Sequence, residues 1–152
     1  MALPNIFSRE VSDKVIQRIN QLQPTTAAKW GKMNVAQMLA HCNVTYEMAY
    51  ENKHTKPNPI MRFVLKTFIK KLVTGEVPYK RNSQTAPAFI MVDEKNFDDE
   101  KERLIGYITK TQQMGETSFD NKESLSFGNL NSIEWNNMFY KHLDHHLTQF
   151  GV

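Results

Sequence analysis

Two histidines near the C-terminus, His142 and His146, have the type and spacing that could hold a metal ion. They lie four positions apart in a predicted helix over residues 132–149, so their rings project side by side. On a helical wheel that starts at Trp135, both fall in the middle of the apolar stripe. Buried imidazole nitrogens without a partner would cost about 1–3 kcal/mol each, whereas neutral imidazole is a good ligand for zinc, nickel, iron or copper.

A third ligand must come from elsewhere in the fold, and His41 is the best candidate. It borders the apolar stripe of a predicted helix over residues 34–52, about a hundred residues upstream of the pair. Three histidines leave a coordination position for water or substrate, as in catalytic sites, whereas structural zinc sites are closed by four protein ligands. We expect His145, at the rim of the stripe, and Gln149 to support the ligands from behind.

A structural interpretation of the histidines also exists, in which core imidazoles bond to backbone or carboxylate groups. His54 lies past the predicted end of its helix and is expected to be exposed. Cys42 adjoins His41, which would suit a Cys–His nucleophile. However, helical neighbours diverge by about 100°, and Cys42 falls on the core stripe. We therefore expect a buried, inert thiol.

The composition is that of a soluble globular protein with one domain over residues 1–152, because 40% of the residues are hydrophobic and 23% charged. A net charge of +3 does not indicate a nucleic-acid partner. No run of about 18 apolar residues predicts a membrane span, and the N-terminus lacks a secretory pattern. A single cysteine allows no intrachain disulfide, so we expect a cytoplasmic protein.

Apolar periodicity predicts helices over residues 8–22, 34–52, 60–73, 98–115 and 132–149. Long connections over residues 76–96 and 116–131 separate them, and the run from Phe89 to Val92 is expected to pin the first connection to the body. No segment alternates strongly with period two, so the fold class is all-α and the architecture a bundle.

The third predicted helix has a basic side formed by Arg62, Lys66 and Lys70. A solvated face is the simpler interpretation of this side. The alternative is an interaction module that meets an anionic lipid surface or an acidic ligand.

Two blocks of sequence resemble the DinB-like (YfiT-like) superfamily of metal-binding helical bundles, in a branch of unknown function. One block runs from Trp30 to Cys42 and contains His41. The other comprises Glu134-Trp135 and the segment from Tyr140 to Val152.

The resemblance implies an up-down-down-up four-helix bundle, often dimeric, with one metal held by His41, His142 and His146. Zinc or nickel is the expected ion, with iron as a further candidate. Better-understood members use the metal to activate a low-molecular-weight thiol, as in thiol S-transferases and thiol-dependent isomerases. This chain departs from the branch at Ser124, where relatives commonly carry a histidine.

Our leading hypothesis is a homodimeric, metal-dependent enzyme that acts on a small molecule, as a thiol S-transferase does. The alternative is a non-catalytic bundle in which the metal stabilises the fold or senses a ligand. Neither hypothesis involves nucleic acid.

Overall fold

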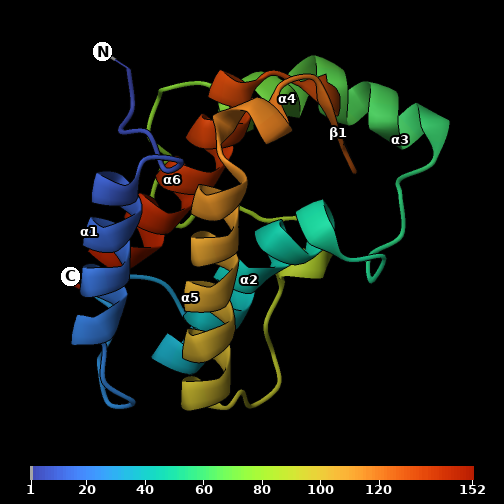
Figure 1. Ribbon diagram of the computed structural model, residues 1–152. Coiled ribbons are helices and arrows are strands. Elements are labelled where there is room, and N and C mark those ends of the chain that lie inside the picture. The colour runs from blue at the N-terminus through green and yellow to red at the C-terminus, as the bar shows by residue number, and fades with distance from the viewer. Residues whose placement is uncertain (1) are drawn as a thin grey trace.

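Four long helices form the body of the molecule, as the ribbon of the computed structural model shows for the described residues 2–152 (Figure 1). They are α1 (Arg9–Gln21), α2 (Val35–Tyr50), α5 (Phe97–Met114) and α6 (Ser132–Gln149). Each lies within a residue or two of its predicted range. The all-α class and the helical bundle are confirmed, with one small addition in the form of a two-stranded hairpin.

Polar caps define where the helices begin. The Asn34 side chain accepts a hydrogen bond from the backbone N–H of Gln37, and the Gln37 side chain accepts one from Asn34 in return. Asn131 and Glu134 form the same reciprocal pair at the start of α6. Such capping boxes satisfy backbone donors that a helix otherwise leaves free, so they fix the register of α2 and α6.

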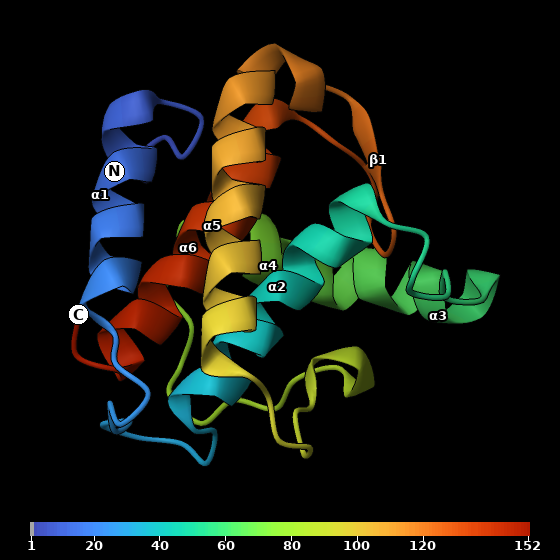
Figure 2. The ribbon, with the colours of Figure 1, turned by 60° about the horizontal axis from the view of Figure 1, so that its bottom comes forward.

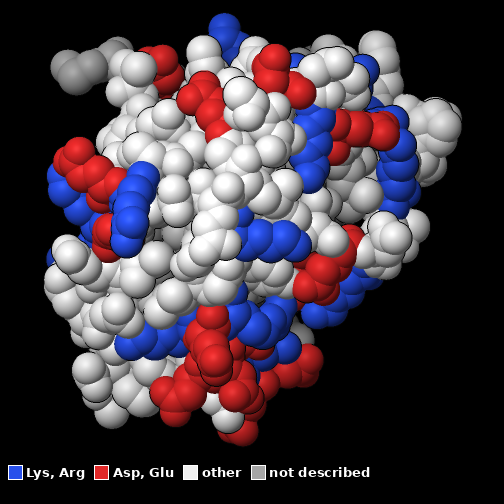
Figure 3. Space-filling model, viewed as in Figure 1, with Lys and Arg blue, Asp and Glu red and all other residues white. Residues whose placement is uncertain are grey.

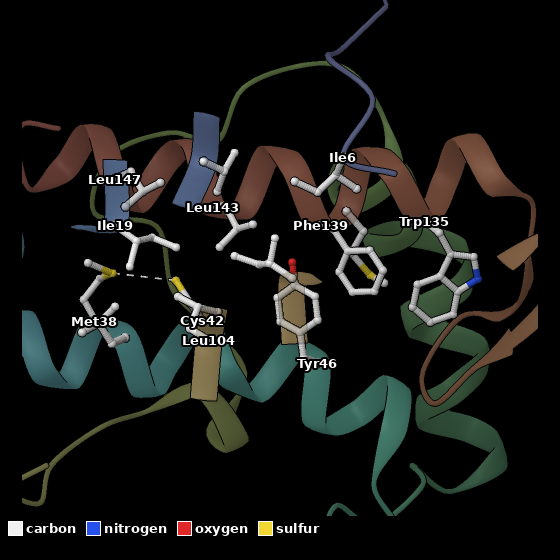
Figure 4. Close-up of a cluster of buried hydrophobic side chains, with 14 of the residues drawn as sticks. Ile6, Ile19, Met38, Cys42, Tyr46, Leu104, Trp135, Phe139, Leu143 and Leu147 are labelled. Atoms are coloured by element: carbon white, nitrogen blue, oxygen red, sulfur yellow. Dashed lines mark hydrogen bonds between the residues drawn. The ribbon is translucent and has the colours of Figure 1, made fainter. Parts of the chain in front are cut away.

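The core joins α2 to α6 (Figure 4). Tyr46 stacks on Phe139, with ring centroids 4.7 Å apart and planes 2° from parallel. Phe139 in turn packs on Trp135, and all three rings are buried. Cys42 is buried in the same layer, as expected, and burial raises the pKa of its thiol. This layer holds two helices that are far apart in the sequence at a fixed distance.

The third predicted helix is divided into α3 (Pro59–Val64), a π-helical turn η1 (Leu65–Ile69) and α4 (Lys70–Thr74). The expectation of a solvated basic side is correct for Lys66, which is exposed, and wrong for Arg62 and Lys70. Arg62 and Lys70 face the body, where each pairs with a glutamate, whereas Phe63 and Phe68 are 68% and 70% exposed. Periodicity shows that a helix has two faces, but the acidic partners that decide which face turns inward lie elsewhere in the chain.

The connection over residues 116–131 contains more structure than the loop expected. A 3₁₀ turn η3 (Glu116–Phe119) precedes strands β1 (Lys122–Ser124) and β2 (Gly128–Leu130), which pair antiparallel. The buried Ser124 hydroxyl donates to the Gly128 carbonyl and accepts from the Phe127 N–H, so Ser124 closes the hairpin. Strands of three residues are too short to reveal themselves by alternation.

The connection over residues 76–96 contains a 3₁₀ turn η2 (Pro87–Phe89). Phe89 and Met91 are half-buried, whereas Ile90 and Val92 are exposed. Two of the four side chains expected to attach this connection to the body therefore face it. Among the described residues, no helix has the length and apolarity needed to cross a membrane.

Replacing Phe139 by alanine should destabilise the fold by about 3–5 kcal/mol, because a buried ring between two aromatic neighbours is lost. Urea unfolding followed by circular dichroism measures this. The matched control is Ile133→Ala on the exposed side of α6, which should change the free energy of unfolding by less than about 0.5 kcal/mol. Equal losses for the two variants would contradict the described core.

Candidate metal centre

His41, His142 and His146 converge at one point between α2 and α6. One nitrogen from each ring lies within 4.8 Å of the others, and the ring centroids are 4.5 to 4.9 Å apart. The Nε2 atoms of His41 and His142 are 3.0 Å apart. Two nitrogens bound to one tetrahedral zinc at 2.0–2.1 Å would be roughly 3.3 Å apart, so the spacing suits a shared ion.

Hydrogen bonds at the opposite ring nitrogens determine which atoms face the centre. His41 Nδ1 lies 2.8 Å from the carbonyl oxygen of Phe89, and His146 Nδ1 lies 2.7 Å from Oε1 of Gln149. Both oxygens can only accept, so each Nδ1 carries the proton and each Nε2 presents a lone pair. Within residues 2–152 the His146 Nε2 has no hydrogen-bond partner.

The orientation of the Gln149 amide is itself fixed. Its Nε2 donates to the carbonyl of Trp30 over 2.7 Å, which leaves Oε1 for His146. Gly31 permits this approach, because a Cβ at that position would stand 2.4 Å from the Gln149 Nε2 atom and the backbone φ is +85°. The Trp30-Gly31 pair therefore supports the orientation of His146 from outside the helix.

The third ring is adjustable. His142 Nδ1 lies 3.0 Å from the Thr45 hydroxyl, which can donate or accept. With Thr45 accepting, His142 Nε2 presents a lone pair to the centre. With Thr45 donating, that nitrogen can instead donate to His41. The site can therefore exist with or without an ion, since one hydroxyl satisfies both tautomers.

Burial keeps the imidazoles in the neutral form that binds metal. It lowers the pKa of His146 to about 3, with a further contribution from the neighbouring His41. Burial also depresses the pKa of His142, and the neighbouring imidazoles of His146 and His41 depress it further. Burial depresses the pKa of His41 as well, although the hydrogen bond to Phe89 opposes this effect. Ligands that are already deprotonated at neutral pH lose no protons when they bind.

Of the two residues predicted to support the ligands, Gln149 makes the hydrogen bond described above, and His145 touches the site only edge-on. The His145 ring is half-buried and lies 5.0 Å from His146, 5.9 Å from Trp30 and 5.7 Å from Tyr79. It lies outside the group of converging nitrogens.

The expectation that His54 would be exposed was wrong. Its side chain is only 17% exposed, and its Nε2 lies 2.7 Å from the carboxylate of Glu47 on α2. The chain folds back after α2, so a residue beyond the helix end returns to the helix. Arg103 and Lys53 also bind Glu47, which makes this a structural ion-pair cluster.

Three contributors were not anticipated. Thr45 lies one helical turn after His41, so the sequence spacing could have predicted that both side chains lie on the same face of the helix. The Phe89 carbonyl belongs to a loop, and no side-chain pattern reveals it. Lys141 looked like an ordinary charged residue, yet it is buried and donates to the carbonyls of Leu72 and Gly75.

Lys141 also lines a pocket near the site. Its ammonium stands 4.7 Å above the Tyr79 ring, and burial lowers its pKa to about 8. Tyr79, His145 and Lys141 line a pocket of about 190 Å³, together with Trp30 and Arg81. The Tyr79 ring is 6.4 Å from that of His142, so one ring of the pocket wall stands between the pocket and the three histidines.

The fold and the site define a helical bundle with a buried three-histidine group that could hold a metal ion. The family described as "Protein of unknown function (DUF1569)" matches residues 7–151, a stretch that includes all three histidines. The chain belongs to this family. The comparisons with curated proteins and with solved structures gave no match.

Replacing Gln149 by leucine should weaken metal binding about 10–100-fold, because His146 loses the acceptor that orients it. Competition with a coloured zinc chelator measures the affinity. Thr148→Ala, at an exposed neighbouring position, is the control and should bind as the parent does. An unchanged affinity in Gln149→Leu would argue that His146 is not a ligand.

Proposed function

We propose that this protein binds one divalent metal ion through the Nε2 atoms of His41, His142 and His146. The observation that carries the proposal is the set of acceptors behind the rings. Phe89 and Gln149 hold two protons on the outer nitrogens, so two lone pairs face one point, where His142 can add a third. Neutral imidazole suits zinc, nickel and iron, and the resemblance to the DinB-like superfamily favours zinc or nickel.

We propose further that the site is catalytic and acts on a small molecule. Three protein ligands leave a coordination position open, and a metal held there acidifies a bound water or thiol. The chain's own residues limit access to it. The Phe89 ring lies 5.2 Å from His41 and 5.8 Å from His142, which shields that side from water.

The neighbouring pocket supports a small substrate. Its volume of about 190 Å³ is below the range of about 300–1,000 Å³ typical of drug-sized ligands. Arg81 and Lys141 place two cations on its wall, and Glu76 and Asp144 place two carboxylates there, so the lining is polar and mixed in charge.

The finer parts of the proposal rest on the resemblance of the two sequence blocks around the histidines to the DinB-like superfamily. It supports membership of that superfamily, a thiol S-transferase-like reaction with a low-molecular-weight thiol, and a homodimer in the cytoplasm. The mass of the protein in solution tests the homodimer.

A second candidate function is a non-catalytic bundle whose metal stabilises the fold. The observation in its favour is that the three ligands tie α2 to α6, with Phe89 adding the loop. In that case the metal would need no coordination position that a thiol can reach. The two functions therefore differ in whether the metal keeps an accessible coordination position.

Cobalt(II) distinguishes them, because tetrahedral cobalt absorbs visible light and a bound thiolate adds a sulfur-to-cobalt charge-transfer band. We expect the cobalt-loaded protein to develop this band when a small thiol is added. The chain's one thiol is buried, and Cys42→Ala serves as the control that should behave identically. If cobalt binds but no thiol tested changes its absorption spectrum, the result would support the non-catalytic function instead.

A further inference from the structure

An apolar stripe on the outside of α3, η1 and α4 has no described partner. It consists of Ile60, Phe63, Phe68 and Leu72, and even its least exposed member is 51% exposed. In a surface helix such side chains ordinarily face the core. A π turn has i→i+5 hydrogen bonds, so it keeps Phe63 and Phe68, which are five positions apart, on the outer side. Large exposed apolar patches mark interaction sites.

Contacts on the inner side hold the stripe outward. Arg62 pairs with Glu123 of the hairpin over 2.6 Å, and Lys70 pairs with Glu134 of α6 over 2.8 Å. Both views of the ribbon place α3 at an end of the molecule far from α1 (Figures 1 and 2). The stripe is thus presented on an anchored arm, and turning it inward would break both ion pairs.

Basic side chains outnumber acidic ones around the stripe. Residues 56–74, which carry the stripe, contain five Lys and Arg residues and no acidic residue. Glu123 and Glu134 pair with Lys56, Arg62 and Lys70, so these residues together have a net charge of +3. Figure 3 shows basic, acidic and uncharged side chains together at the α3 end. Among the described residues, Lys66 and Lys71 have no acidic partner within ion-pair distance.

A hollow beside the stripe adds room for an anionic group. It has a volume of about 600 Å³ and is lined by Lys56, Arg62 and Lys66 together with Pro59 and Phe63. Glu123 engages Lys56 and Arg62, which leaves the Lys66 ammonium for an incoming phosphate.

We propose that this arm binds the surface of an anionic phospholipid bilayer. The side chains of the stripe would enter the boundary between headgroups and acyl chains, while Lys66 and Lys71 meet lipid phosphates. Interfacial helices combine these same two features, an apolar face with aromatic residues and a basic polar face. Basic side chains close to the membrane surface strengthen the attachment to anionic lipids.

Charge favours a bilayer over the other occupants of such a face. A second copy would bring two such positively charged faces together, which like-charge repulsion opposes. Nucleic acid would satisfy the lysines, but its phosphate backbone would leave Ile60, Phe63 and Phe68 against a charged surface. An anionic bilayer supplies acyl chains for the stripe and phosphates for the cations at the same time.

Sedimentation of the full-length protein with vesicles tests the proposal. We expect binding to vesicles of phosphatidylcholine mixed with phosphatidylglycerol, much weaker binding to phosphatidylcholine alone, and weakening by salt. The double variant Phe63→Ser, Phe68→Ser should lose at least tenfold in partitioning. Ile90→Ser, Val92→Ser is the matched control, since both side chains are exposed but lie outside the stripe, and it should bind as the parent does.

Three results would overturn the proposal. One is that the parent protein does not sediment with anionic vesicles. Another is that the Phe63→Ser, Phe68→Ser variant binds as tightly as the parent while its circular dichroism is unchanged. The third is a dimer in analytical ultracentrifugation that the same variant converts to a monomer, because a second copy would then cover the stripe. None of these results depends on the metal.

Discussion

The packing of α2 against α6 is the interaction on which the candidate metal centre depends. The Tyr46 and Phe139 rings stack in parallel. His41 lies about one turn before Tyr46 on α2, and His142 lies about one turn after Phe139 on α6. The two histidines are 101 positions apart in the sequence, and their Nε2 atoms meet at 3.0 Å because the core between α2 and α6 sets the helix spacing. Packing of large apolar side chains thus converts separate sequence blocks into one site.

Groups outside the two helices complete the site. The loop over residues 76–96 begins where Lys141 binds the Gly75 carbonyl, and it returns to the histidines through the Phe89 carbonyl. From the opposite direction, the segment around Trp30 holds the Gln149 amide. Each imidazole is therefore oriented by a hydrogen bond as well as by its rotamer, which is the arrangement that fixes tautomers in metal sites.

Much of this could be predicted from local sequence. Apolar periodicity placed the long helices, and the wheel positions of His142 and His146 followed from 3.6 residues per turn. What escaped prediction depends on distant partners. The Phe89 carbonyl has no sequence signature, and the inward side of α3 and α4 was decided by Glu123 and Glu134, far along the chain.

Metal content is the most direct test of whether the three histidines hold one metal. Elemental analysis would compare the untagged protein with a His142→Ala, His146→Ala variant that folds to the same circular dichroism spectrum. We expect about one zinc, nickel or iron per chain in the parent and none in the variant. A parent protein without metal, even after loading with zinc or nickel, would contradict it, as would a variant that keeps its metal.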